Sequence, residues 1–290
     1  MSPAVAGRAL VRGGGDLPPP PDPPELPAGA RPRWPAWSGF AAMLAGTAVV
    51  AVLVIPFIPL VLLLEQDGTP GAFALLVLLL LQDSAYVGTA IGFAFRRGRP
   101  RAWQFGLRPS PLWRTVTIAV VAGLLILGFE LGYVELLDVD EGNADDLGGG
   151  DSVLAVVAVS LAVIVVAPVT EELFFRAFFY RSLRNGLAVA PAALINGLVF
   201  GALHFQGPDS LAILPVIAVF AVGACIVYEA TGSIFAPIAI HAAFNSFAIA
   251  STDTGLAVPL VVGAVVLTAC LVVPLRLGRA PSPFPPHARA

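Results

Sequence analysis

Long apolar stretches dominate this chain and leave it few ways to fold. Hydrophobic residues make up 57% of its 290 residues and charged residues only 12%, about half of what a soluble domain carries. A helix of about 20 apolar residues crosses the hydrocarbon core of a bilayer. Eight such stretches are present: Trp37–Leu64, Ala72–Phe95, Trp113–Leu137, Val153–Tyr180, Leu187–Phe205, Leu211–Tyr228, Ile234–Ala250 and Leu256–Leu275. The composition excludes a soluble globule and predicts an all-α membrane protein, an eight-span transmembrane helical bundle.

The charges between these stretches alternate in sign. Arginine is the only basic residue apart from histidine, and it gathers in residues 8–33, 96–114, 181–184 and 276–289. The acidic segments are residues 65–67, 138–151, 209 and 253. Because arginine-rich loops stay in the cytoplasm, we expect both termini to be cytoplasmic. We also expect the tryptophans on the arginine-rich side to be interfacial anchors; these are Trp34, Trp37, Trp103 and Trp113.

A small set of polar residues interrupts the later apolar stretches. Ionisable groups at membrane depth are costly and persist mainly where they do chemistry or line a pathway. The fourth, fifth and seventh stretches carry, in order, Glu171, Glu172 and Arg176, then Phe200 and His204, then His241 and Asn245. Glu172 and Arg176 are four residues apart and should form an ion pair on one helix face. Glu171 lies about 100° around the helix and points elsewhere.

These residue types suit hydrolysis by an activated water. Glu171 can accept a proton from water, and His204 can orient that water and then pass a proton to a leaving amine. His241 and Asn245 can donate to the oxyanion of a tetrahedral intermediate. Glu172, Arg176 and Phe200 are the supporting residues. No serine or cysteine has comparable support, and we expect Cys225 and Cys270 to be packing residues.

Each motif also has a structural interpretation. The Glu–Arg pair can be a salt bridge near a helix end, and an intramembrane histidine can be a hydrogen-bonding residue between helices. Asp83 and Glu130, on the second and third stretches, can be packing or access-path residues. Two other function classes follow, a proton-coupled carrier and a non-catalytic immunity or scaffold protein. The ordered occurrence of the motifs on separate stretches favours an enzyme.

The three motifs Glu-Glu-x-x-x-Arg, Phe-x-x-x-His and His-x-x-x-Asn resemble those of the CPBP family of intramembrane peptidases, the CAAX-protease and bacteriocin-processing (Abi) family. The resemblance covers residues 152–250, and the Phe-Gly-Leu-Arg-Pro stretch at 105–109 is similar to the family's lead-in. It implies proteolysis within or beside the membrane. It also implies that Glu171, His204 and His241 form the catalytic set, with Asn245 as the last member of the third motif.

The residues of the predicted site are compatible with a metal-dependent or a metal-free mechanism. Members of the family are commonly labelled metalloproteases, and zinc or another divalent metal could be held by Glu171, His204 and His241 with an open position. The chain lacks the His-Glu-x-x-His helix that presents two ligands and a base together. We therefore favour a metal-free glutamate mechanism and no cofactor.

The expected organisation follows from these assignments. Residues 1–36 are rich in proline, glycine and arginine and cannot bury enough apolar surface to become ordered, so we expect a disordered cytoplasmic tail. The other regions are a three-span region with an acidic external loop (37–151), the catalytic core (152–250), the last span (251–275) and a short cytoplasmic tail (276–290). The expected partners are the lipid bilayer, in a bacterial cytoplasmic membrane, and a membrane-associated protein or peptide substrate. No nucleic acid is expected.

Overall fold

The computed structural model of the chain describes residues 34–63, 65–66, 69–70, 72–137, 153–250 and 257–277. The tails expected over 1–36 and 276–290 and the acidic loop at 138–151 lie almost wholly outside these residues. In the described part, every element is a helix except one antiparallel hairpin of two-residue strands. The all-helical prediction is therefore confirmed for this part of the chain.

The elements follow the apolar stretches closely. The first three stretches form α1 (Ser38–Val54), η1 (Ile55–Phe57), α2 (Ile58–Leu63), the hairpin β1 (Glu65–Gln66) and β2 (Thr69–Pro70), α3 (Ala72–Phe95), η2 (Ala102–Phe105) and α4 (Leu112–Leu137). The fourth stretch forms α5 (Val153–Ser160), η4 (Leu161–Val166), α6 (Ala167–Glu172), η5 (Leu173–Tyr180) and α7 (Arg181–Leu183). The remaining elements are α8 (Val189–Leu203), η6 (Pro208–Ala212), α9 (Leu214–Thr231), α10 (Phe235–Ala250) and α11 (Ala257–Arg276).

Six of the eight predicted stretches are helical segments long and apolar enough to cross a membrane within the described residues. The exceptions are α8 and α10, with 15 and 16 residues, because about 20 residues are needed to cross the hydrocarbon core. These two short helices carry both histidines of the predicted site. The chain thus has the helices of an integral membrane protein, while the count of eight crossings and the orientation of the termini stay predictions.

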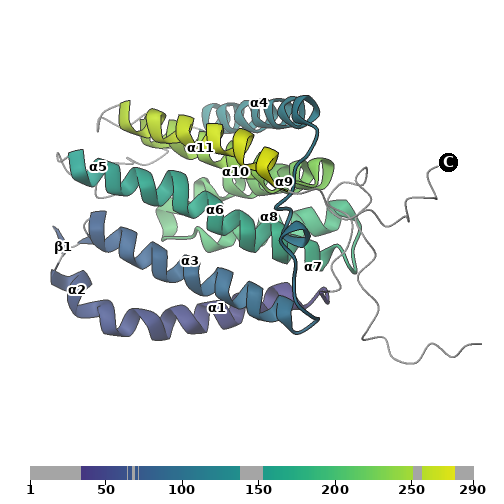
Figure 1. Ribbon diagram of the computed structural model, residues 1–290. Coiled ribbons are helices and arrows are strands. Elements are labelled where there is room, and N and C mark those ends of the chain that lie inside the picture. The colour runs from purple at the N-terminus through teal and green to yellow at the C-terminus, as the bar shows by residue number, and fades with distance from the viewer. Residues whose placement is uncertain are drawn as a thin grey trace, which may run out of the picture.

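The fourth segment forms the centre of the bundle. In Figure 1, α5 and α6 run between α1 and α3 on one side and α10 and α11 on the other, and each of these layers contacts part of the segment. The apolar window within Val153–Leu183 is 44% buried, against 6% for the windows of α1–α2 and α4. A helix that is apolar all round yet exposed in the fold faces lipid. The outer helices therefore shield the central one, which carries the acidic pair.

The helical hydrogen-bond register changes around Pro168. Both η4 and η5, which flank α6, are π-helical, and the Ala167 N–H donates to the carbonyl of Ala162, five residues back. Proline has no N–H and usually kinks or breaks a helix. A π turn shifts the bonding by one residue and lets the chain pass the proline. At Pro168 the chain thus changes register inside one long segment.

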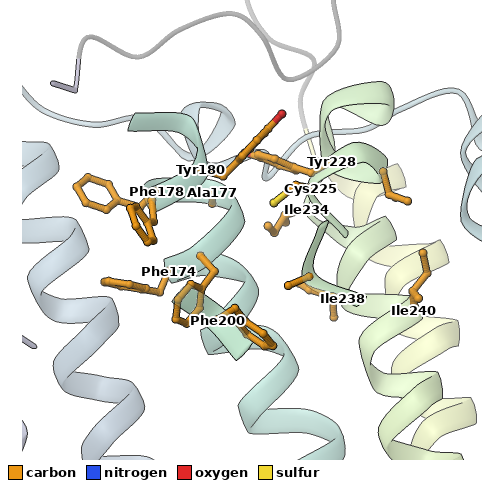
Figure 2. Close-up of a cluster of buried hydrophobic side chains, with 14 of the residues drawn as sticks. Phe174, Ala177, Phe178, Tyr180, Phe200, Cys225, Tyr228, Ile234, Ile238 and Ile240 are labelled. Atoms are coloured by element: carbon orange, nitrogen blue, oxygen red, sulfur yellow. The ribbon is translucent and has the colours of Figure 1, made fainter. Parts of the chain in front are cut away.

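A close-packed aromatic layer lies beside the polar residues of the fourth segment. Figure 2 shows side chains from the fourth segment, α8, α9 and α10 meeting there. Phe175 and Phe200 pack edge to face with ring centroids 4.9 Å apart, and Tyr180 and Tyr228 are also fully buried. Aromatic pairs in this arrangement add specific geometry to apolar burial. The layer fixes α8 against the fourth segment, which brings Phe200 to the site.

Trp34 is not an interfacial anchor, and that prediction is wrong. Its side chain is only 3% exposed and packs between Phe105 and Phe178, with ring centroids at 4.9 and 5.0 Å. Its backbone carbonyl also accepts a hydrogen bond from Asn185. Trp34, four residues before α1, therefore lies in the core. Trp113, by contrast, is 80% exposed, as an interfacial residue can be.

The lead-in stretch at 105–109 clamps the turn before α10. The carbonyl of Gly106 accepts a hydrogen bond from the Ile234 N–H at 2.9 Å, and Arg108 Nε donates to the carbonyl of Gly232. Gly106 has φ +74°, and a Cβ there would lie 2.5 Å from the ring of Tyr228. Only glycine tolerates both the positive φ and this close approach. The clamp fixes where α10 begins and so where its histidine lies.

Candidate active site

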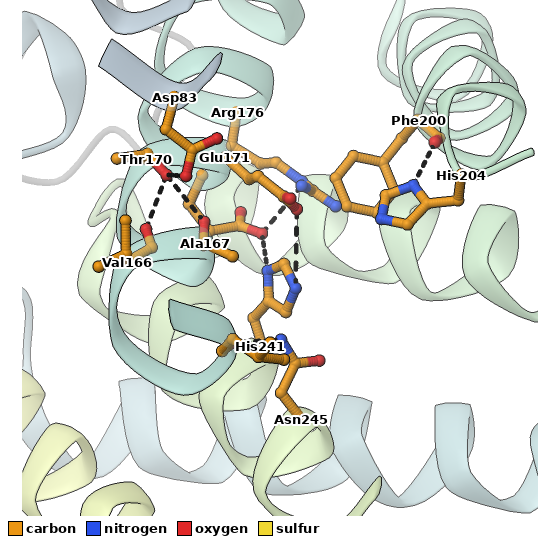
Figure 3. A network of polar contacts seen from close by, with 12 residues as sticks. Asp83, Val166, Ala167, Thr170, Glu171, Arg176, Phe200, His204, His241 and Asn245 are labelled. Carbon is orange, nitrogen blue, oxygen red and sulfur yellow. Dashed lines mark hydrogen bonds and ion pairs between the residues drawn. The ribbon is translucent and has the colours of Figure 1, made fainter. Parts of the chain in front are cut away.

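A buried ion pair on the fourth segment contacts α10 through its carboxylate. Arg176 Nη1 lies 2.8 Å from Glu172 Oε1, and neither side chain is exposed. The same carboxylate oxygen lies 2.9 Å from His241 Nδ1 (Figure 3). The predicted Glu172–Arg176 pair is therefore confirmed. The structure adds a contact that the spacing did not predict, since Glu172 also holds the imidazole of another helix.

The imidazole of His241 contacts two carboxylates. Glu171 Oε2 is 3.8 Å from His241 Nε2, the ring nitrogen that does not contact Glu172 (Figure 3). Because the Glu172 carboxylate accepts, Nδ1 carries the proton that it donates. Nε2 therefore faces Glu171 as the nitrogen that can exchange a proton. The two carboxylates therefore converge on one imidazole, so the expectation that Glu171 points elsewhere is not confirmed, and its side chain keeps 17% exposure.

Aromatic contacts connect His204 to this cluster. The Arg176 guanidinium lies 4.5 Å from the ring centroid of Phe200, a cation–π distance. The Phe200 ring is 4.6 Å from the ring of His204 and 6.1 Å from that of His241. The two histidines therefore flank one phenylalanine. The long fourth segment and the short α8 bring Arg176, Phe200 and His204 to the same region.

The hydrogen bond of His204 determines which ring nitrogen is available. His204 Nδ1 lies 2.8 Å from the backbone carbonyl of Phe200. A carbonyl can only accept, so Nδ1 carries the proton, and in the neutral ring the lone pair is on Nε2. Figure 3 shows the imidazole turned from the end of α8 toward the cluster. His204 can therefore accept or return a proton through Nε2.

Asn245 has a structural partner in the π-helical segment. Its Nδ2 donates to the backbone carbonyl of Val163 at 2.7 Å. In an α-helical register this carbonyl would accept from Ala167, but the Ala167 N–H goes to Ala162. In a π register it would accept from residue 168, which is proline and has no N–H. Val163 thus has a carbonyl that no helical N–H reaches, and Asn245 satisfies it.

This contact leads to a prediction about stability. Asn245→Ala should lower the free energy of unfolding by about 1–3 kcal/mol, because a buried carbonyl then has no donor. Unfolding of the purified protein in detergent, followed by circular dichroism, measures the change. Ser246→Ala is the matched control, since the Ser246 hydroxyl donates to the Ala242 carbonyl in its own helix. Equal stability losses in the two variants would contradict the assigned role of the Asn245–Val163 bond.

Asp83 lies next to the site, although the sequence pattern did not include it. It is on α3, is 3% exposed, and accepts a hydrogen bond of 2.6 Å from the hydroxyl of Thr170, the residue before Glu171 (Figure 3). A buried acid in an apolar helix was the available signal. What the sequence could not supply is which helix packs on the fourth segment. Glu130, the other isolated acid, lines a different cavity between α4 and α10, which none of the motif residues lines.

A second missed group supports the fourth segment from α8. Asn196 is fully buried, and its Nδ2 donates to the carbonyl of Phe175 at 2.9 Å. Its side-chain oxygen accepts from the thiol of Cys225 at 3.2 Å. Cys225 and Cys270 are both free. The fully buried Cys225 packs in the core, as expected, and its thiol contacts Asn196 there.

The carboxylates of the site retain hydrogen-bonding capacity. Within the described residues, Glu171 Oε2 and Glu172 Oε2 are buried and have no hydrogen-bond partner. Most buried polar atoms in folded proteins are hydrogen-bonded. A small polar molecule entering the site can donate to these oxygens. A water with hydrogen bonds of about 2.8 Å can contact Glu171 and His241 at the same time, because 3.8 Å is shorter than two such bonds end to end.

Glu171, His204 and His241 are suitable ligand types for zinc. The Nδ1 atoms of both histidines are engaged by oxygen acceptors, which leaves both Nε2 atoms available, as in histidines that bind a metal. However, no three histidine, cysteine, aspartate or glutamate side chains in the described ranges are grouped as they would be around one ion. The metal-free mechanism stays the prediction, and a metal requirement stays its alternative.

The fold and the site together define a class of protein. The chain is an integral membrane protein with an ion pair and an imidazole at the meeting of three apolar helices. Residues 153–247, about a third of the chain, match the model of the family described as "Type II CAAX prenyl endopeptidase Rce1-like". The match confirms the resemblance to the CPBP family over this segment, which contains all three motifs. No curated protein and no solved structure matches the chain.

Proposed function

We propose that this chain is an intramembrane endopeptidase of the CAAX-protease type, which hydrolyses a peptide bond of a membrane-associated protein or peptide. The observation that carries the proposal is the meeting of Glu171, His241 and the Phe200–His204 turn around one buried arginine. The family match over residues 153–247 supports the same class of activity. A bacterial cytoplasmic membrane is the proposed location.

In the proposed reaction, Glu171 is the general base. It takes one proton from water as the water oxygen attacks the scissile carbonyl carbon. His204 Nε2 then carries a proton to the leaving amine as the carbon–nitrogen bond breaks. The proton removed from water is thus the one that the amine gains. The products are a carboxylic acid and an amine, and no other reactant is needed.

His241 and Asn245 are the proposed oxyanion donors. Donation from His241 Nε2 requires protons on both ring nitrogens, since Nδ1 is bound by Glu172. His241 carries that second proton before the water attacks, so Glu171, whose oxygen lies 3.8 Å from Nε2, is still free to take the proton from water. Asn245 uses one amide hydrogen for the Val163 carbonyl, and an amide has a second one. The Glu172–Arg176 pair holds the imidazole in position.

The proposal is tested by removing the base without changing the shape of the side chain. Glu171→Gln should abolish cleavage, because an amide cannot accept the proton from water. The measurement is a proteomic comparison of membrane peptides in cells that carry the wild-type or the variant protein. Cleavage products present only with the wild type are the expected result.

Controls separate the alternative functions. Glu130→Gln should leave cleavage unchanged, because Glu130 lines the cavity between α4 and α10. If Glu171→Gln changes proton-coupled flux but not the membrane peptides, the carrier is favoured. If it changes neither, the scaffold is favoured. Metal analysis and chelation of the active purified protein test the metal alternative. Retained activity in metal-free protein is expected.

A further inference from the structure

An open groove of about 570 Å³ lies on the outer face of the α1–α3 pair. Its floor is a row of small residues on α3, among them Ser84, Gly88 and Gly92. They are four residues apart and share one helix face. A Cβ added at Gly88 or Gly92 would meet nothing within 4 Å. The groove is therefore open along the helix and is not filled by the protein's own side chains.

The walls and one end of the groove differ in character. Val49 and Leu53 of α1 form an apolar wall, and Arg96 lies at the end, directly after α3. The guanidinium of Arg96 lies 5.2 Å from the ring centroid of Phe93, which also lines the groove. This stacking directs the cation along the groove wall. The groove thus combines an apolar channel with a single positive end.

The length of the groove matches one leaflet of a bilayer. Twelve residues separate Ser84 from Arg96, which is about 18 Å of helix at about 1.5 Å per residue. The hydrocarbon core is about 30 Å thick, so one leaflet contributes about 15 Å. A chain seated along the floor would therefore reach from the membrane surface to about the midplane. Its polar end would lie at the arginine.

We propose that this groove binds an anionic phospholipid, with one acyl chain over Gly88 and Gly92 and the phosphate at Arg96. Arginine binds phosphate oxygens in a two-pronged geometry. Exposed arginines at 97, 99 and 101 follow in the same loop and add positive potential there. The site lies on the face of α3 that is turned outward, and it is independent of the proposed proteolysis.

A second copy of this chain is the competing occupant, because glycines four apart also permit close helix pairing in membranes. A symmetric pair packed through this groove in the same orientation would bring two arginine clusters together. Like charges in contact oppose such a pairing, whereas an anionic lipid complements them. Charge complementarity therefore favours the lipid.

The test measures lipid retention by the full-length purified protein. Native mass spectrometry counts the phosphatidylglycerol and phosphatidylcholine molecules that stay bound after exposure to an equal mixture. Wild-type protein should retain phosphatidylglycerol in preference. Arg96→Gln should reduce the retention of phosphatidylglycerol about fivefold. Arg97 does not line the groove, so Arg97→Gln should reduce this retention much less.

Two glycine variants, one inside the groove and one outside it, test the position of the acyl chain. Gly92→Leu fills the groove, and Gly132→Leu is its control, since a Cβ at either position meets nothing within 4 Å and Gly132 is on α4 outside the groove. Loss of retained lipid in Gly92→Leu alone is expected. Equal effects of the two arginine variants, or full retention in Gly92→Leu, overturn the proposal. A wild-type dimer abolished by Gly92→Leu with unchanged lipid retention would assign the groove to a second copy instead.

Discussion

Replacing Arg176 with methionine should cause the largest loss of stability of any single change at the site. The side chain is fully buried, and it is paired with Glu172 at 2.8 Å. Removing one partner leaves the other as an uncompensated buried charge, which costs about 3–5 kcal/mol. The free energy of unfolding in mixed detergent micelles measures this loss. Methionine keeps much of the arginine volume, so lost packing is a minor part of the effect.

Two further variants show whether the unpaired charge is the cause. The double variant Glu172→Gln/Arg176→Met removes both charges and should recover a large part of the lost stability. Arg184→Gln breaks a more exposed ion pair, that of Arg184 with Glu229. The two side chains of this pair are 11% and 15% exposed. This variant should cost less, because water screens and solvates Glu229. A double variant no more stable than Arg176→Met would contradict this account.

Unlike Arg176→Met, His204→Gln should abolish most cleavage while the free energy of unfolding stays close to that of the wild type. We expect a decrease of about 10²–10⁴ in the cleavage rate, the usual contribution of a general acid or base. The fold should tolerate the change because His204 follows the last residue of α8 and its side chain has one hydrogen bond, to the carbonyl of Phe200, among those described. Cleavage kinetics on a peptide found by the proteomic comparison provide the measurement.

The pH dependence separates proton transfer from positioning. The His204→Gln variant should lose the limb of the pH–rate profile that belongs to the proton donor. Asn196→Ala is a useful comparison, since Asn196 joins α8 to the carbonyl of Phe175, contacts no motif histidine in the described bonds, and is replaced by a residue that does not titrate. A slower enzyme with an unchanged pH profile is expected there. An unchanged profile in His204→Gln as well would remove His204 from the proposed reaction.

Local spacing and apolar length were enough to predict much of this structure. The Glu172–Arg176 pair follows from a separation of four residues, which fixes two side chains on one helix face whatever surrounds them. The helices follow from apolar stretches that cannot remain unpaired in lipid. The common neighbourhood of Glu171, His204 and His241 was inferred from chemistry alone, and it depends on helix ends that apolar runs do not define.

The sequence pattern did not predict the contacts between segments that are distant along the chain. The π register around Pro168 depends on which N–H reaches which carbonyl, and apolar periodicity does not encode it. Asp83 joins the site because α3 packs against α6. Trp34 lies in the core because its ring packs against Phe105 and Phe178, which are distant in sequence. Each of these results depends on tertiary neighbours that a single sequence does not reveal.

The bond between Asn245 and Val163 joins residues 82 positions apart, which has a consequence for assembly. During synthesis the fourth segment enters the bilayer long before Asn245 leaves the ribosome. Until α10 arrives, the Val163 carbonyl has no donor from its own helix. The register around Pro168 is therefore completed late, and the acidic pair gains its final geometry only when the histidine-bearing helix docks. The contacts between the fourth segment and α10 are therefore complete only after α10 has docked.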